Sequence, residues 1–215
     1  RDRLIVKEFE LDPLADIWIV PDMSVYEHVE AKDVEAGYSL NQLDIPKWMQ
    51  REEFRLPPTT EEYTVTIAAS LAQYFLRLDR SVGMMAYGQV NEIVQPDRGE
   101  RQLNRLLETL SVLRVEGKIR IENVLQAEAH LFPRGTTVIV VTPTARSEWA
   151  SAARQLKQRG LRVVTVLVNP ASFGERFKST DELFSLLRAS GTGAYAVDCD
   201  DDLTAALSAG HHMRA

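Results

Sequence analysis

Two side chains that can supply oxygen ligands stand at alternate positions directly after an apolar segment. Residues 15–20 read ADIWIV, and after Pro21 come Asp22 and Ser24, with Tyr26 two residues further on. Carboxylate and hydroxyl oxygens are the ligands that Mg²⁺ prefers in proteins. Tyr26 stands where a further small hydroxyl would continue the series. The pattern predicts either a divalent-cation site or the remains of one, with Asp22 and Ser24 as the ligands if any metal binds.

A second group of carboxylates lies near the C-terminus, in the sequence DCDDDL at residues 198–203. These groups could bind a hard cation, but acids that precede a helix also accept hydrogen bonds from its free N–H groups. We expect the capping role, because the helix-like segment LTAALSA follows. Cys199 is the single cysteine. It excludes an internal disulfide, and we expect it to be a small buried side chain.

Common nucleotide-binding and catalytic motifs are absent from the sequence. There is no GxGxxG, no GxxxxGK[ST] and no GxSxG. The four histidines, His28, His130, His211 and His212, lack the spacing of a metal site or a triad. The net charge of −6 argues against nucleic-acid binding, which needs clustered Lys and Arg. We therefore expect no catalytic residue and no nucleic-acid partner.

Strand-like and helix-like segments alternate along the chain, which predicts an α/β fold. The expected strands are 4–11, 15–20, 81–88, 91–96, 136–142, 161–168 and 194–198, and the expected helices begin at Thr59 or Thr60 and then cover 100–113, 121–132, 147–159, 179–190 and 201–209. Such alternation gives right-handed crossovers and a doubly wound, mainly parallel sheet with helices on both faces. Apolar and charged residues alternate in 4–11, which predicts an antiparallel edge strand there.

We expect a single domain at residues 1–210, with a long inserted loop at 27–58 and a tail at 211–215. In doubly wound sheets, ligands bind at the carboxyl ends of the strands. This rule selects the loops 21–28, 88–100, 142–147, 169–175 and 198–202.

The sequence has no apolar segment of the roughly 20 residues that a membrane-spanning helix needs, and no signal peptide opens it. We therefore expect no transmembrane segment in this chain and a cytoplasmic location. Because the sequence begins with Arg1 rather than Met, it is compatible with a fragment whose membrane anchor lies upstream.

The segment IVPDMS, an apolar strand that ends in Asp-x-Ser, resembles the first motif of the von Willebrand factor A domain. The segments AASLAQYFLRLDRSVGMMAYG, DRGERQLNRLLETL and TVIVVTP resemble the version of this domain in the bacterial "domain of unknown function 58" family, over residues 4–143. This resemblance implies an adaptor or assembly factor with a protein partner, such as the MoxR-type AAA+ ATPases encoded beside family members, and a membrane-anchored parent. It also implies a metal-ion-dependent adhesion site, which holds magnesium through Asp-x-Ser-x-Ser, a threonine of a second loop and an aspartate after a later strand.

Only part of that adhesion site carries over to this sequence. Tyr26 replaces the second serine, Arg101 aligns with the threonine and Pro143 aligns with the final aspartate. The expected rim of a degenerate site consists of Asp22, Ser24, Tyr26, Arg98, Arg101, Thr142 and Pro143. Because two protein oxygens leave magnesium mostly to water, we expect no cofactor and at most weak magnesium binding.

The sequence is compatible with two different environments of the Asp22 side chain. A guanidinium, from Arg98 or Arg101, could take the place of the cation and pair with the carboxylate. Alternatively, Asp22 caps the following turn and faces water.

The function that these residues favour is a non-catalytic protein-interaction module that binds a partner through the loops at the carboxyl ends of the strands. The aromatic residues Tyr26, Tyr38, Trp48 and Phe54 are candidate contacts. One alternative is a metal-dependent hydrolase or phosphotransferase that uses Asp22. Another is a scaffold or dimerisation domain of a membrane-anchored parent.

Overall fold

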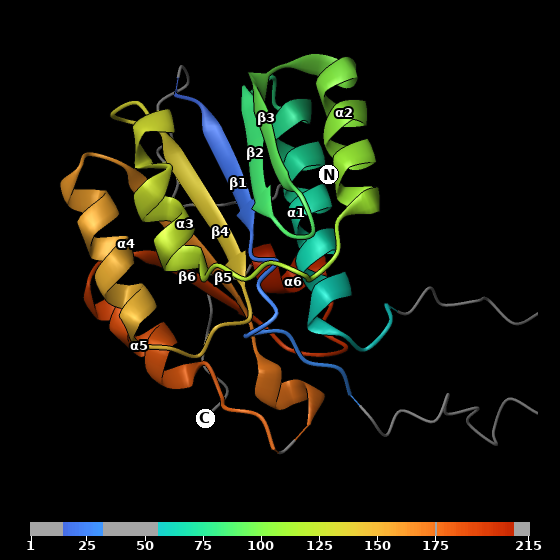
Figure 1. Cartoon of the computed structure of the whole chain (residues 1–215), viewed down its shortest axis with the longest axis vertical. Helices are drawn as coiled ribbons and strands as arrows, with labels where there is room; N and C mark the ends of the chain where they lie inside the picture. The colour runs from blue at the N-terminus through green and yellow to red at the C-terminus, as the bar shows by residue number, and fades with distance from the viewer. Residues whose placement is uncertain (1–14, 32–55, 175, 209–215) are drawn as a thin grey trace, which may run out of the picture.

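A computed structural model of the protein describes residues 15–31, 56–174 and 176–208, and its centre is a six-stranded sheet (Figure 1). The strands are β1 (Ile17–Pro21), β2 (Val82–Tyr87), β3 (Asn91–Asp97), β4 (Thr137–Thr142), β5 (Arg162–Val168) and β6 (Gly193–Val197). Their order in the sheet is β3-β2-β1-β4-β5-β6, and every neighbouring pair is parallel except β2 and β3. The expected α/β class with one antiparallel edge strand is confirmed.

Whereas the sequence predicts the antiparallel edge strand at 4–11, the antiparallel edge strand is β3, at the position of the strand expected at 91–96. It contains Pro96, which has no N–H for a ladder and therefore suits an edge. Gly83 of the neighbouring strand β2 lies against this proline, and a Cβ at position 83 would lie only 2.9 Å from the Pro96 ring. The close approach explains why this position is a glycine. The expected strand at 4–11 lies outside the described residues, as does the tail at 211–215.

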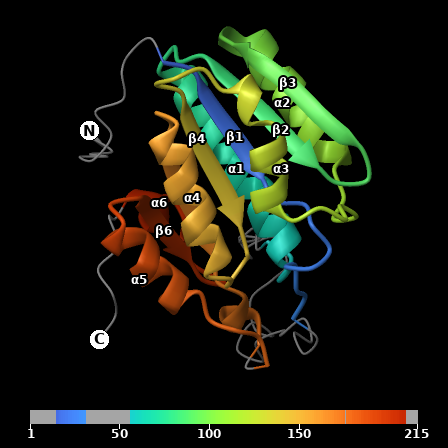
Figure 2. The same cartoon turned by 60° about the vertical axis from the view of Figure 1, so that its left-hand side comes forward.

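Helices cover both faces of the sheet, as Figure 1 and the turned view of Figure 2 show. One face carries α1 (Thr60–Arg77), α2 (Gly99–Val112) and α6 (Leu203–Ser208), and the other carries α3 (Ile121–Ala127), α4 (Glu148–Gln158) and α5 (Asp181–Ala189). Two short 3-10 turns, Ala129–Leu131 and Pro170–Phe173, complete the described elements. The helix expected at 121–132 is thus divided into α3 and the first of these turns.

The central strand β1 is buried along its whole length, because β2 and β4 flank it and helices cover both its faces. Side chains of a strand alternate between faces. Ile17 and Ile19 accordingly join the core under α1, whereas Trp18 and Val20 join the core under α3 and α4. Full burial of such side chains stabilises the fold by about 2–3 kcal/mol each. This packing fixes the point at which the chain leaves the sheet at Asp22.

The beginning and the end of the long insertion lie side by side. Ala31 N donates to Pro58 O over 3.1 Å, and Glu30 forms an antiparallel bridge with Thr59. Thr59 is the N-cap of α1, where its side chain accepts a hydrogen bond from Glu62 N, as expected. Residues 32–55, with Tyr38, Trp48 and Phe54, lie outside the described residues.

No helix within the described ranges is long and apolar enough to cross a membrane.

Candidate functional site

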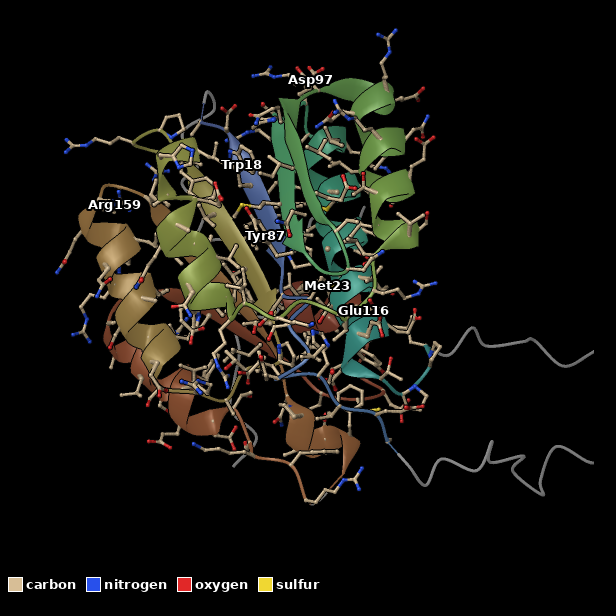
Figure 3. The ribbon with its side chains drawn as sticks, in the orientation of Figure 1. Trp18, Met23, Tyr87, Asp97, Glu116 and Arg159 are labelled. Carbon is tan, nitrogen blue, oxygen red and sulfur yellow. The ribbon has the colours of Figure 1, made fainter. Side chains whose placement is uncertain are left out.

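The loop that follows β1 is joined by backbone hydrogen bonds to two other segments at the carboxyl edge of the sheet. Asp22 N donates to Val141 O of β4 over 2.8 Å. Gly117 N donates to Met23 O over 3.0 Å, and Val25 N donates to Gly117 O over 2.9 Å. Figure 3 shows Met23 and Glu116 near each other at this edge. The second loop of the rim is therefore the connection between α2 and α3, at residues 113–120.

Asp22 lies beneath this rim with only 2% of its surface exposed. Its Oδ2 accepts a hydrogen bond from Thr142 Oγ1 over 2.7 Å, and its Oδ1 accepts one from Ser24 N over 3.0 Å. Burial raises the pKa of Asp22 to about 7, although both hydrogen bonds oppose this rise, and nearby Glu27 and Glu122 add to it. The carboxyl group therefore changes charge near neutral pH.

Thr142, the last residue of β4, supplies the donor to Asp22, and the connection that follows it is buried at its start. Thr142 Oγ1 also accepts a hydrogen bond from Thr144 N over 3.1 Å. Pro143 lies between these two threonines and is buried. Its ring carries no oxygen or nitrogen that could serve as a ligand, so the third segment of the rim contributes only the hydroxyl of Thr142 to the surroundings of Asp22.

Tyr26 is the outward-facing member of the first loop. Its side chain is 55% exposed, whereas Ser24 is buried and its Oγ accepts a hydrogen bond from Tyr26 N over 3.4 Å. The guanidinium of Arg120 lies over the Tyr26 ring, 4.8 Å from its centroid, and also forms an ion pair with Glu27. Arg120 of the second loop thus forms a cation–π contact with Tyr26 of the first loop, at residues 21–28.

His28 connects the first loop to α1, a role that the sequence alone does not indicate. Its Nε2 lies 2.6 Å from the carbonyl oxygen of Asp22, and its Nδ1 lies 3.2 Å from Thr60 Oγ1. Because a carbonyl only accepts hydrogen bonds, Nε2 carries the proton. Burial lowers the pKa of His28 to about 4, against the effect of the bond to Asp22. The imidazole is therefore neutral at physiological pH.

The pairing of Asp22 with Arg98 or Arg101, one of the two alternatives that the sequence leaves open, is wrong. Asp97 pairs with Val82 at the start of β2, and Arg98 forms an ion pair with Asp79 over 3.6 Å. Because β3 runs antiparallel to its neighbour β2, the chain has returned to the amino edge of the sheet before α2 begins. Figure 3 shows Asp97 at the opposite end of the sheet from Met23.

Of the loop expected at 88–100, only the turn between β2 and β3 therefore lies at the rim. The alternative expectation, that Asp22 caps the following turn and faces water, is half right. The carboxylate accepts the hydrogen bond of a turn from Ser24 N, but it is buried and does not face water.

Two arginines near the rim form ion pairs, Arg120 and Arg146. Arg146 forms ion pairs with Glu122, over 3.9 Å, and with Glu148, over 2.9 Å. Arg120 thus pairs with Glu27 of the first loop, and Arg146 pairs with glutamates of α3 and α4. Sequence reasoning missed them because their positions depend on the pairing of Gly117 with the first loop and on the path of the connection after β4.

The acidic segment at 198–202 caps backbone groups, as expected. Asp202 Oδ1 accepts hydrogen bonds from Thr204 N and Ala205 N at the start of α6, and Asp201 Oδ2 accepts one from Asp198 N. Cys199 is partly buried, and burial raises the pKa of its thiol. Among the described residues, no group of three or more His, Cys, Asp or Glu side chains is arranged to hold a metal ion.

The sheet order and the covering helices define an α/β domain whose fold is consistent with the von Willebrand factor A-like type. The structure is similar to BatB, a conserved hypothetical protein from Bacteroides thetaiotaomicron, with a TM-score of 0.57 and 15% identity over 91% of this chain and 96% of that one. It is also similar to an aerotolerance-related membrane protein from Bacteroides fragilis, with a TM-score of 0.52 and 14% identity over the same shares.

A third similar structure is the pilus adhesin SpaC from Lactobacillus rhamnosus GG, with a TM-score of 0.55 and 12% identity over 91% of this chain but 30% of the adhesin. No protein-family model matches the sequence, and no curated protein matches it either. At these identities the similarity shows the fold alone.

Proposed function

We propose that this protein is a non-catalytic protein-interaction module of the von Willebrand factor A type, with a degenerate metal-ion-dependent adhesion site. The observation that carries the proposal is the closed environment of Asp22. Both of its carboxylate oxygens accept hydrogen bonds from the protein, from Thr142 Oγ1 and from Ser24 N, and the side chain is buried. The carboxylate of Asp22 thus stabilises the loops of the rim through these hydrogen bonds and is not exposed to a ligand.

The residues around Asp22 do not fit a magnesium ion. Magnesium requires near-octahedral oxygen coordination. The place of the second serine is taken by Tyr26, whose ring lies under Arg120, and the segment after β4 offers Pro143 instead of an aspartate. The second loop reads GKIR at residues 117–120 and supplies a cation rather than a threonine oxygen. Asp22, Ser24 and the Thr142 hydroxyl leave such an ion too few protein ligands.

The burial of Asp22 also supports a non-catalytic role over a hydrolase or phosphotransferase. A nucleophilic or metal-binding carboxylate must reach the substrate, and Asp22 has 2% of its surface exposed. A generic screen of phosphatase and phosphodiesterase substrates with Mg²⁺ and Mn²⁺ tests this point. We expect no turnover above that of the matched variant Asp22→Asn; turnover lost in Asp22→Asn would favour the enzyme.

The partner that the family resemblance favours is a MoxR-type AAA+ ATPase, with this domain in the cytoplasm and a membrane anchor elsewhere in the parent protein. The similarity to an aerotolerance-related membrane protein of Bacteroides supports a parent of that kind. Co-purification of the full-length parent with the ATPase encoded beside its gene tests the proposal. Release of the ATPase by Tyr26→Ala, with retention by the distant exposed variant Leu186→Ala, is the expected result.

Calorimetry tests the degenerate site directly. We expect no heat of binding when Mg²⁺ or Mn²⁺ is added to the wild-type protein. We expect measurable affinity in the triple variant Tyr26→Ser, Arg120→Thr and Pro143→Asp, which restores oxygen ligands on all three segments of the rim. The matched control carries Arg101→Thr in place of Arg120→Thr and should bind more weakly, because Arg101 lies at the other edge of the sheet. Tight magnesium binding by the wild type would contradict the proposal.

A further inference from the structure

Three exposed apolar side chains gather on the first and second loops of the rim. They are Val25, Tyr26 and Ile119, with exposed fractions of 45%, 55% and 48%, and together they form the rim patch. Val25 N is hydrogen-bonded to Gly117 O, and Arg120, next to Ile119, lies over the Tyr26 ring. These contacts hold together the two loops that carry the three exposed side chains. Clustered exposed apolar groups mark interaction sites more often than isolated ones do.

The aromatic member of the rim patch is held in place before any partner arrives. Arg120 lies over one face of the Tyr26 ring, and Glu27, whose side chain is 11% exposed, holds the guanidinium by an ion pair. The Tyr26 backbone is tied by its N–H to Ser24 Oγ. An exposed tyrosine that is already ordered loses little conformational entropy on binding, which is a property of the aromatic residues that dominate interface energetics.

The second loop carries a local excess of basic side chains in a chain of net negative charge, although Glu27 of the first loop pairs with one of them, Arg120. The chain contains 31 acidic and 25 basic residues, yet the second loop carries Arg114, Lys118 and Arg120 against the single acid Glu116. Arg114 and Lys118 are exposed, and no ion pair joins either of them to another residue in the described part of the chain. The Arg114 guanidinium donates a hydrogen bond to the carbonyl oxygen of Leu113, which leaves its charge uncompensated, and both charges can attract a partner of negative charge.

We propose that the rim patch binds an acidic segment of a partner protein without a metal ion. In this arrangement an apolar side chain of the segment packs on Tyr26 and Ile119, and flanking carboxylates pair with Lys118 and Arg114. This inference rests on the proposed interaction function and adds to it the surface and the chemistry of the partner. Nucleic acid would also be attracted to the basic side chains, but Glu27, Glu116 and the net charge of −6 disfavour it.

A library of phage-displayed random peptides of about 12 residues provides the test, with the whole chain as bait and EDTA present throughout. We expect the selected peptides to combine Asp or Glu with a large apolar residue. Synthetic copies should bind at least about tenfold more weakly to Lys118→Glu and to Ile119→Asp, which is a loss of about 1.4 kcal/mol. Binding should also weaken as salt rises from roughly 0.05 to 0.5 M.

Two variants at distant exposed positions serve as controls. Arg159→Glu reverses a charge at the end of α4, far from the rim (Figure 3), and Leu186→Asp replaces an exposed apolar residue of α5. Both should bind the peptides like the wild type, and circular dichroism should show that all four variants are folded. Fluorescence anisotropy with a labelled single-stranded oligonucleotide should show no binding by the wild type.

The outcomes separate this inference from the proposed function. If the selected peptides are neutral or basic and their binding is lost in Ile119→Asp, the proposal of an acidic partner is overturned, whereas the interaction function is supported. Peptides that bind only after magnesium replaces EDTA would overturn the metal-free mode. No selected peptide, or peptides that respond to the control variants alone, would count against both.

Discussion

Thr142 donates its hydroxyl hydrogen to Oδ2 of Asp22 over 2.7 Å, and this buried bond joins the carboxyl ends of the adjacent strands β4 and β1. The two residues are separated by 120 positions in the sequence. The contact exists because Pro21 pairs with Val141 in the sheet, which places Asp22 beside Thr142.

The variant Thr142→Val should destabilise the fold. It removes a donor to a buried carboxyl group and the acceptor of the Thr144 N–H, so we expect a loss of about 1–3 kcal/mol in the free energy of unfolding. The loss should be larger when Asp22 is ionised, because hydrogen bonds to charged acceptors are stronger. Urea unfolding at roughly pH 5 and pH 8, below and above the pKa of Asp22, measures both. Thr109→Val, which removes an exposed hydroxyl of α2, is the control and should change little.

The pH dependence of stability should reveal two opposing contributions, from Asp22 and from His28. The pKa of Asp22 is raised from 3.8 to about 7 on folding, so its contribution to stability is full below pH 3.8 and is lost as the pH rises towards 7. The pKa of His28 is lowered from 6.5 to about 4, so stability is lost through this residue as the pH falls from 6.5 towards 4. The two slopes offset each other in the wild type over much of this range.

Single substitutions should separate the two slopes. In Asp22→Asn, the free energy of unfolding should rise with pH between about 4 and 6.5, because only the His28 contribution remains. In His28→Gln it should fall over the same range, because only Asp22 remains. Denaturant unfolding at closely spaced pH values measures the slopes. Identical profiles for the two variants would contradict the assigned surroundings of both groups.

Gly117→Ala should disturb the junction between the first and second loops. An added Cβ would overlap the carbonyl oxygen of Tyr87 and lie 2.8 Å from Met23 O, and neither backbone group can move away easily. We expect a loss of about 1–3 kcal/mol in thermal or urea unfolding, as for overpacked sites. Gly193→Ala is a matched control, because its Cβ would meet Val164 at an ordinary 3.5 Å. Equal stability of the two variants would show that the loops are not joined in this way.

Arg120→Gln should cost more than Arg98→Gln. Arg120 contributes a cation–π contact with Tyr26 and an ion pair with the mostly buried Glu27, and its loss leaves that carboxylate without its cation. We expect a loss of about 1–2 kcal/mol in the free energy of unfolding. Arg98 forms an exposed ion pair with Asp79, which is worth at most about 1 kcal/mol. A larger loss of unfolding free energy in Arg98→Gln than in Arg120→Gln would contradict the contacts assigned to Arg120.

The elements of the fold could be predicted from the sequence because their patterns are local. The continuous apolar run of β1 predicts a strand covered on both faces, and the Thr59 cap with two glutamates predicts the start of α1. The alternation of such elements then predicts the sheet class. The capping role of the acids at 198–202 follows equally from short-range spacing, since Asp202 bonds to residues two and three positions away.

The surroundings of Asp22 could not be predicted in the same way. The sequence identifies Asp22, Ser24 and Tyr26 as one group because they are neighbours, and it identifies Thr142 through the end of a later strand. The choice between Arg101 and Arg120 depends on the direction of β3, which no residue pattern in Arg98 or Arg101 reveals.

By itself, the sequence determined which segments become strands and helices and that a carboxylate ends the central strand. It did so because burial and hydrogen bonding of the backbone impose periods of two and 3.6 residues on the chain. Only the tertiary structure decided what contacts that carboxylate. The antiparallel return of β3 carried Arg98 and Arg101 to the far edge, and the bonds between Gly117 and the first loop brought Arg120 over Tyr26. Such contacts join residues that are distant in the sequence, and their register is set by packing of the whole sheet rather than by any local spacing.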